Sequence, residues 1–222
     1  MKINYQIKRS SRRKSITIKV ESYTGKVTVL APTSTPLSRI EGVINKRAEW
    51  ITEKINAVNQ RNLILPKIEN GALIYIAGKS YFLSLTECRR SSVKGEIITL
   101  PIASPKSSLI NLTKKLFLPY VQAKTQYIAE TCGFRYKSVS LNKAKRKWGS
   151  CSVNGEITFS TALAYLPDEI CDYVVLHELC HTKEMNHQAG FYAILSRFMP
   201  DYKVRQKQLK TFSSYLSYFY ED

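Results

Sequence analysis

The chain has 222 residues, and its 44% of hydrophobic and 23% of charged residues are typical of a folded globular protein, which argues against general disorder. Thirty-four Lys and Arg against seventeen Asp and Glu leave a net charge of +17, which favours a polyanionic partner such as nucleic acid or a nucleotide, or else a solubilising surface. The longest apolar runs, such as residues 72–78, are too short to cross a bilayer, so no membrane partner is expected.

The first residues and the cysteine content indicate in which cellular compartment the protein is found. The basic start, MKINYQIKRSSRRK, is followed by no apolar stretch that could form the core of a signal peptide. The five cysteines are an odd number without a CxxC pair, which fits a reducing compartment better than a disulfide framework. We therefore expect a cytoplasmic protein.

The first part of the chain is predicted to be rich in β-structure. Strand-like alternation of residue type occurs in four stretches, at residues 15–20, 26–31, 70–85 and 96–100. Residues 36–58 instead show apolar side chains at helical spacing. We expect residues 1–100 to form a β-rich N-terminal region with one helix.

Residues 101–108, rich in Pro and Ser, are the best candidate for a linker, and after them the pattern becomes mainly helical. Residues 109–132 predict a long helix, with Gly133 as its C-terminal cap. Two short strands and two more helices follow, at residues 138–141, 156–160, 167–183 and 188–199. The chain is thus predicted to be an α+β protein whose second domain covers residues 109–222.

All three histidines of the chain lie in one short stretch, HELCHTKEMNH, at residues 177–187. His177 and His181 are four residues apart on a predicted helix, so both imidazoles project from one face and can bind the same ion. Nitrogen ligands in an open tetrahedral site suit Zn²⁺. Glu178 completes an HExxH motif, in which the metal lowers the pKa of a bound water and the glutamate accepts its proton, so that hydroxide attacks a carbonyl or phosphoryl centre.

The third ligand is a choice between Glu184 and His187. Glu184 lies about 10 Å further along the helix axis than His177, too far for easy sharing of one ion. If the helix ends near Glu184, His187 can return to the ion, because Asn186 tolerates the left-handed turn that this requires. We therefore assign His177, His181 and His187 as the ligands of one zinc ion per chain, with water in the fourth position.

A metallohydrolase also needs groups that stabilise a developing oxyanion. The candidates are Arg146 and Lys147 before Trp148, and Tyr192 and Tyr202 after the third histidine. Each tyrosine also has a structural interpretation, since the chain contains fourteen tyrosines and most of them pack rather than react.

The run RKWGSCSVNGEITFSTALAYLPDEICDYVVLHELCHTKEMNHQAGFYAILSRFMPDYK resembles the YgjP-like metallopeptidase domain family of metal-dependent hydrolases, which is related to SprT-like and WLM zinc proteases. The segments RSSRRKSITIKV, APTSTPLSRIEGVINKRAEWITEKI and IYIAGKSYFLSL resemble that family's first half. The resemblance implies a zincin-like catalytic domain with zinc at His177, His181 and His187 and with Glu178 as general base. Lys147 stands where the family usually has arginine, and Ser160 where it commonly has asparagine.

Three functions are compatible with these residues. The leading hypothesis is a cytoplasmic zinc-dependent peptidase that binds a protein or peptide along the sheet edge beside residues 156–160. The alternative is a metal-dependent pyrophosphatase of UTP-type nucleotides, an activity also described for the family, with the basic residues before Trp148 holding the triphosphate. The third is a nucleic-acid-binding module with structural zinc, against which Glu178 argues, since a structural site has no use for a base.

Overall fold

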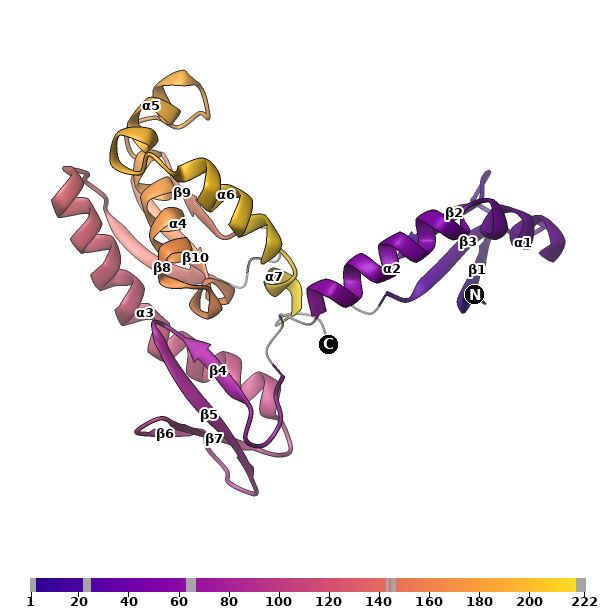
Figure 1. The fold of residues 1–222 in the computed structure, drawn as a ribbon, viewed down its shortest axis with the longest axis horizontal. Helices are drawn as coiled ribbons and strands as arrows, with labels where there is room; N and C mark the ends of the chain where they lie inside the picture. Colours follow the sequence, from indigo (N-terminus) through magenta and orange to yellow (C-terminus); the bar gives the residue numbers. More distant parts are fainter. Residues whose placement is uncertain (1–2, 22–24, 63–66, 143, 145–146, 219–222) are drawn as a thin grey trace. The chain divides into compact units, whose positions relative to one another are not determined.

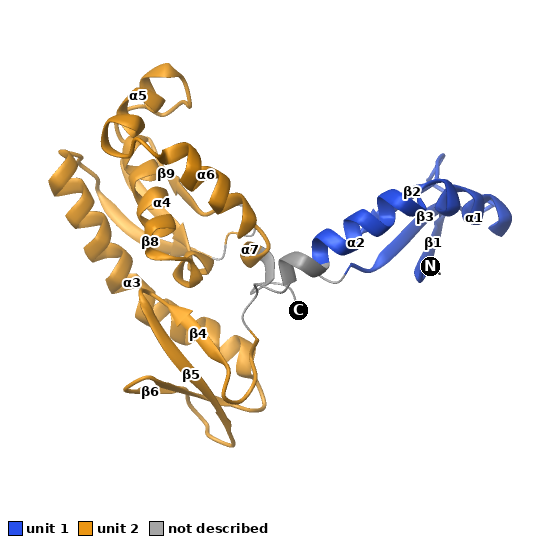
Figure 2. Cartoon of the chain, in the orientation of Figure 1, with its two compact units in different colours: residues 1–65 blue, residues 66–222 orange. Residues whose placement is uncertain are grey.

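Figure 1 shows the computed structural model of the chain, which describes residues 3–21, 25–62, 67–142, 144 and 147–218. The chain divides into two compact units, residues 1–65 and 66–222 (Figure 2). The strands of residues 73–101 therefore belong with the second unit, whereas the sequence pattern grouped them with the first. The reason is that these strands pack on the long helix that follows them.

The described residues of unit 1, residues 1–65, form a three-stranded sheet with two helices. Strands β1 (Tyr5–Ser10), β2 (Thr17–Val20) and β3 (Val27–Pro32) are ordered β1-β3-β2, and β3 runs parallel to β1 and antiparallel to β2. The helices are α1 (Leu37–Lys46) and α2 (Ala48–Asn62), where the sequence predicted one helix. The break lies at Arg47, whose φ of −111° leaves the helical region. Buried apolar residues of both layers form the core: Val27, Val29, Ala31, Ile40, Ile44 and Ile51.

Unit 2, residues 66–222, begins with a four-stranded sheet. Strands β4 (Leu73–Ile76), β5 (Lys79–Thr86), β6 (Ser92–Lys94) and β7 (Ile97–Pro101) are ordered β4-β5-β7-β6. The turn between β4 and β5 has positive φ at Ala77 and Gly78, which is typical of a two-residue hairpin. The buried face of this sheet packs on helix α3 (Pro105–Cys132). Helix α3 ends at Gly133, whose φ of 68° confirms the predicted cap.

Helix α3 continues past a second sheet, as Figure 1 shows. Strands β8 (Ser138–Asn142), β9 (Gly149–Cys151) and β10 (Glu156–Ser160) are ordered β8-β10-β9. The short helix η1 (Thr161–Tyr165) leads into α4 (Asp168–Cys180), and α5 (Ala189–Phe198), α6 (Tyr202–Thr211) and α7 (Tyr215–Tyr218) complete the chain. Helix α4 contacts α3, β9, α5 and α6 and is therefore at the centre of this part of unit 2.

Among the described strands, the sheet edge that is open to a substrate is not the one predicted from the sequence. The sequence placed a substrate beside residues 156–160, but β10 is the central strand, with β8 on one side and β9 on the other. Strand β9, where the sequence predicted no strand, pairs antiparallel to β10 through Cys151 opposite Ile157 and Gly149 opposite Phe159. Both edges of β10 are therefore covered, and among the described strands the outer one on that side is β9.

The α+β fold class is confirmed, because helices and separate small sheets alternate through both units. All five cysteines are free. None of the helices in the described ranges is both long enough and apolar enough to span a membrane.

Candidate metal centre

Helix α4 and the turn after it carry the three histidines. The helix begins after Pro167 with Asp168 and Glu169 in its first turn, where acidic side chains favour the positive end of the helix dipole. It ends at Cys180, earlier than the predicted residue 183, and His181 is its C-cap. This early end lets the chain turn back, so that His187 lies beside His177 although it is ten residues further along the chain.

The three imidazoles converge on one point. One nitrogen of each of His177, His181 and His187 lies within 4.8 Å of the others. The Nε2 atoms of His177 and His187 are 3.0 Å apart, so these two rings either share a hydrogen bond or direct two lone pairs at one ion. Burial and the neighbouring imidazoles lower the pKa of His177 to about 3, which keeps this ring neutral and able to act as a ligand.

Two neighbours hold the rings in place. The fully buried Phe191 of α5 has its ring centroid 4.9 Å from that of His177 and 4.7 Å from those of His181 and His187. The Nδ1 atom of His181 lies 3.1 Å from the backbone oxygen of Glu184. When Nδ1–H donates this hydrogen bond, Nε2 keeps its lone pair for an ion. The side chain of Glu184 is exposed, and this residue is not a member of the three-histidine cluster.

Glu178 lies in the same cavity as the histidines. This cavity has a volume of about 420 Å³ and is lined by all three histidines, Glu178, Tyr173 and the strand β9, among others. The Glu178 side chain is 5% exposed, and its Oε2 atom is buried without a hydrogen-bond partner among the described residues. Burial raises the pKa of Glu178 to about 7, although the positive charge of Lys147 acts in the opposite direction.

These residues fit a divalent metal ion. Three imidazole nitrogens that converge on one point are the ligands that zinc and similar ions prefer. The buried Glu178 Oε2 and His177 Nδ1 atoms have no partner within the described ranges, and unsatisfied polar atoms of this kind are unusual outside functional sites. The arrangement suits a catalytic rather than a structural site, because it offers three ligands and a free carboxylate.

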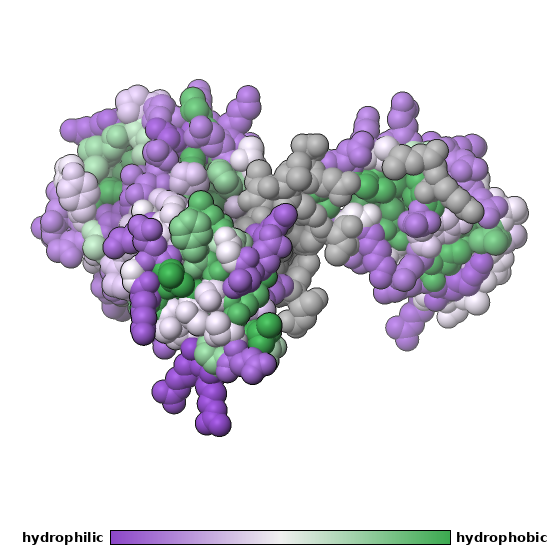
Figure 3. All heavy atoms as spheres, turned by 60° about the horizontal axis from the view of Figure 1, so that its bottom comes forward, coloured by the Kyte–Doolittle hydropathy of each residue, from purple (hydrophilic) through white to green (hydrophobic). Residues whose placement is uncertain are grey.

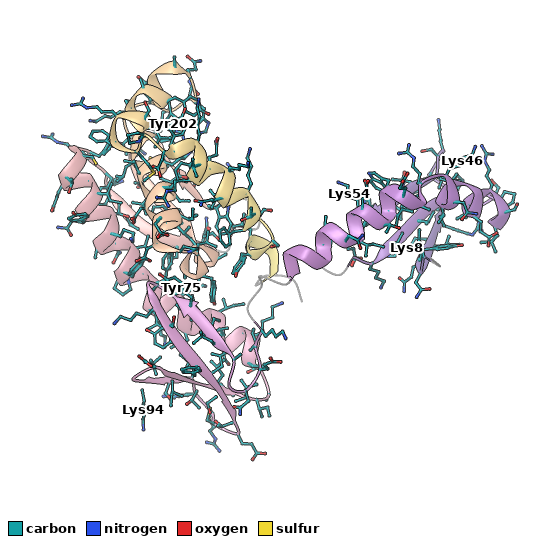
Figure 4. All side chains as sticks on the ribbon, in the orientation of Figure 1. Lys8, Lys46, Lys54, Tyr75, Lys94 and Tyr202 are labelled. Carbon is teal, nitrogen blue, oxygen red and sulfur yellow. The ribbon has the colours of Figure 1, made fainter. Side chains whose placement is uncertain are left out.

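The other residues predicted for the site have different positions. Lys147 is exposed and lines the cavity, whereas Arg146 lies outside the described residues. Tyr192 and Tyr202 stack with ring centroids 5.7 Å apart (Figure 4 labels Tyr202), and neither lines the cavity. Tyr173 does line it and was not among the residues predicted from the sequence. The spacing could have indicated this residue, because Tyr173 precedes His177 by about one helical turn and so lies on the same face of the helix.

An α+β domain with three convergent imidazoles and a buried carboxylate in one cavity is the arrangement of a metal-dependent hydrolase. The YgjP-like metallopeptidase domain family matches residues 14–212, and the chain belongs to this family. This match confirms the resemblance seen in the sequence and supports a metal-dependent peptidase.

Two solved structures are similar to part of the chain. The metallopeptidase zymogen abylysin of Pyrococcus abyssi is 23% identical, with 41% of this chain and 92% of that chain covered and a TM-score of 0.39. The metallopeptidase zymogen jannalysin of Methanocaldococcus jannaschii is 19% identical, with 42% and 95% covered and a TM-score of 0.37. No curated protein matches the chain.

Proposed function

We propose that this protein is a zinc-dependent peptidase in which His177, His181 and His187 hold one zinc ion and Glu178 is the general base. The observation that carries the proposal is that the Glu178 carboxyl and the three imidazoles line one cavity next to the edge strand β9. A zinc ion bound there would supply a Lewis acid that lowers the pKa of water and polarises a peptide carbonyl.

The chain's own contribution to the reaction is proton transfer by Glu178. Its Oε2 atom has no partner in the described part of the chain, so it is free to accept the proton of the attacking water. The same carboxyl can then deliver that proton to the leaving amine nitrogen. Because Glu178 is buried, bulk water does not compete for this position.

We further propose that the substrate binds as an extended peptide along β9. Within the described residues this strand pairs with β10 alone, so its other edge offers backbone N–H and C=O groups to an additional strand. A peptide on this edge passes along the cavity, because Gly149, Ser150 and Cys151 all line it.

The basic charge supports a second proposal, that polyanions recruit substrates to the enzyme. Residues 1–65 contain thirteen Lys and Arg but only four Asp and Glu. Hydrophilic side chains project from both units in Figure 3, and Figure 4 labels Lys8 on the sheet and Lys46 and Lys54 on the helices of unit 1. We expect the affinity of the full chain for DNA or RNA to fall steeply with salt, whereas salt-independent or absent binding would overturn the recruitment proposal.

A nucleotide pyrophosphatase remains the second candidate activity, and one observation favours it. Lys147 is exposed at the cavity that holds the three histidines, where its charge suits a phosphate group.

The five cysteines are free thiols, which fits a reducing compartment and is compatible with either activity. We therefore propose that the protein acts in the cytoplasm.

One experiment separates these activities. Wild type, Glu178→Gln and the matched control Glu87→Gln, an exposed acid in the bend directly after β5, are purified and their zinc content is measured. Each is assayed with casein-type substrates and with nucleoside triphosphates. We expect one zinc per chain in all three, and proteolysis by wild type and the control only. Triphosphate turnover without proteolysis would exclude the peptidase, and an active Glu178→Gln would exclude the proposed base.

A further inference from the structure

Gly149, the first residue of β9, lies directly against the Glu178 side chain. A Cβ atom added at Gly149 would be 2.7 Å from both Cγ and Oε1 of Glu178, and 2.9 Å from its Cδ. Real Cβ atoms essentially never approach another atom closer than 3.0 Å. None of the other glycines comes so close to a neighbour, the next being Gly78, whose added Cβ would lie 3.2 Å from Tyr120.

The backbone conformation does not explain why this position is a glycine. Six glycines of the chain have positive φ, where a side chain would be strained, but Gly149 is not among them. Its φ is open to any residue, and it pairs regularly with Phe159 in the ladder between β9 and β10. The requirement at this position is therefore space for Glu178.

Neither backbone next to this contact can move easily. The strand is held by its pairing with β10 and by the hydrogen bond from the Ser160 amide to the Trp148 oxygen, 2.8 Å long. On the other side, α4 is one of the most buried helices of unit 2. An added methyl group would therefore displace the most movable partner, which is the Glu178 carboxyl itself.

We infer that Gly149 is a positioning residue for Glu178: its bare Cα leaves the space in which the carboxyl is held between β9 and α4. Packing against β9 has this role because no described group donates a hydrogen bond to Oε2, so a donor does not orient this oxygen. This inference rests on the proposed function, in which Glu178 transfers the proton. A carboxylate misplaced by about 1 Å can reduce the rate of such a step by roughly a hundredfold.

The steric contact is tested first, without any activity. Gly149→Ala is introduced into wild type, Glu178→Gln and Glu178→Ala, and the midpoint of urea unfolding is measured for the full chain. We expect a lower midpoint in wild type and in Glu178→Gln, which has the same shape, and no change in Glu178→Ala, where the obstructing side chain is absent. An equal decrease in all three backgrounds would overturn the inference. Gly42→Ala is the control for an added methyl group without a steric conflict, because a Cβ there meets nothing within 4 Å; it should not lower the midpoint, since alanine is favoured over glycine inside helix α1.

The functional consequence is tested next. In Gly149→Ala, we expect kcat to fall by about tenfold or more, with KM and zinc content changed by less than about twofold. A changed KM with unchanged kcat would show that Gly149 serves only substrate binding and would overturn the positioning role. If Glu178→Gln is active, the proposed function fails on its own, whatever the result of the unfolding experiment. If Glu178→Gln is inactive and Gly149→Ala retains full kcat, only the positioning role fails.

Discussion

The hydroxyl of Tyr120 on α3 donates a 2.7 Å hydrogen bond to Oδ1 of Asp168, in the first turn of the helix that carries His177. The same oxygen accepts a second hydrogen bond, 2.8 Å long, from the Tyr75 hydroxyl on β4. A nearby ion pair between Lys124 on α3 and Asp172 on α4 strengthens this junction. Three elements that are far apart in the sequence are thus joined at the start of the helix that leads to the metal centre.

We therefore expect Asp168→Ala to lower the free energy of unfolding by about 2 kcal/mol, because it leaves two half-buried tyrosine hydroxyls without their acceptor. The measurement is urea unfolding at pH 7. Glu169→Ala is the control, since Glu169 is an exposed acid in the same helical turn, and its effect should stay below about 0.5 kcal/mol. Equal effects of the two substitutions would mean that the tyrosine contacts do not stabilise the junction.

The same junction predicts a pH dependence. Burial raises the pKa of Asp168, but the hydrogen bonds from Tyr120 and Tyr75 and the charge of Lys124 outweigh it and leave the pKa below its ordinary value of 3.8. A carboxyl of this kind stabilises the fold above the pKa of the unfolded state, and the contribution disappears as pH falls through the folded pKa. The difference in unfolding free energy between wild type and Asp168→Ala should stay constant from about pH 7 to 5 and shrink below about pH 4. A difference that grows on acidification would contradict this assignment.

Phe191 is predicted to matter for both folding and metal binding, because its buried ring contacts all three imidazoles. We expect Phe191→Ala to cost about 3–5 kcal/mol of stability and to weaken zinc binding, while Phe191→Leu largely restores both. Zinc affinity is measured by competition with a chromophoric chelator. Phe198→Ala is the control on the same helix, since Phe198 packs on Phe134 instead and should reduce stability without changing zinc affinity.

Metal removal gives a further prediction. A chelator should abolish proteolysis, and zinc should restore it. If zinc binds only the folded chain, free zinc at a hundred times its Kd should raise the free energy of unfolding by about 2.7 kcal/mol. His187→Ala should lose this increase, and its metal-free stability should change little because His187 is an exposed residue outside the helices. An undiminished increase in this variant would exclude His187 as a ligand.

The features that could be predicted from the sequence depend on local spacing. The four-residue interval between His177 and His181 predicts a shared helical face whatever surrounds it, and Gly133 marks the end of α3 because a left-handed residue is needed there. The condition for His187 to reach the other two histidines was a helix end near Glu184. Helix α4 ends earlier than that, at Cys180, and His187 lies with the other two histidines.

The features that could not be predicted depend on tertiary pairing. Strand β9 has three residues, Gly-Ser-Cys, without alternation or strong β-propensity, and it becomes a strand only because β10 lies beside it. The Pro- and Ser-rich stretch at residues 101–108 looked like a linker, but Pro101 ends β7 and Pro105 starts α3, where proline suits the first helical position. The close contact of Gly149 with Glu178 joins positions 29 residues apart, which no local pattern reveals.

Helix α3 has a practical consequence for anyone who wishes to isolate the catalytic part of the chain. Its Thr113 bonds to Tyr165 of η1, its Gln122 donates to the Val139 oxygen of β8, and it also packs on β4 and β7. A truncated protein starting at residue 109 would cut this helix and remove the sheet that covers it, exposing the apolar side chains that now form the interface. We expect such a fragment to aggregate on expression, whereas one starting at residue 66 should unfold in a single cooperative transition.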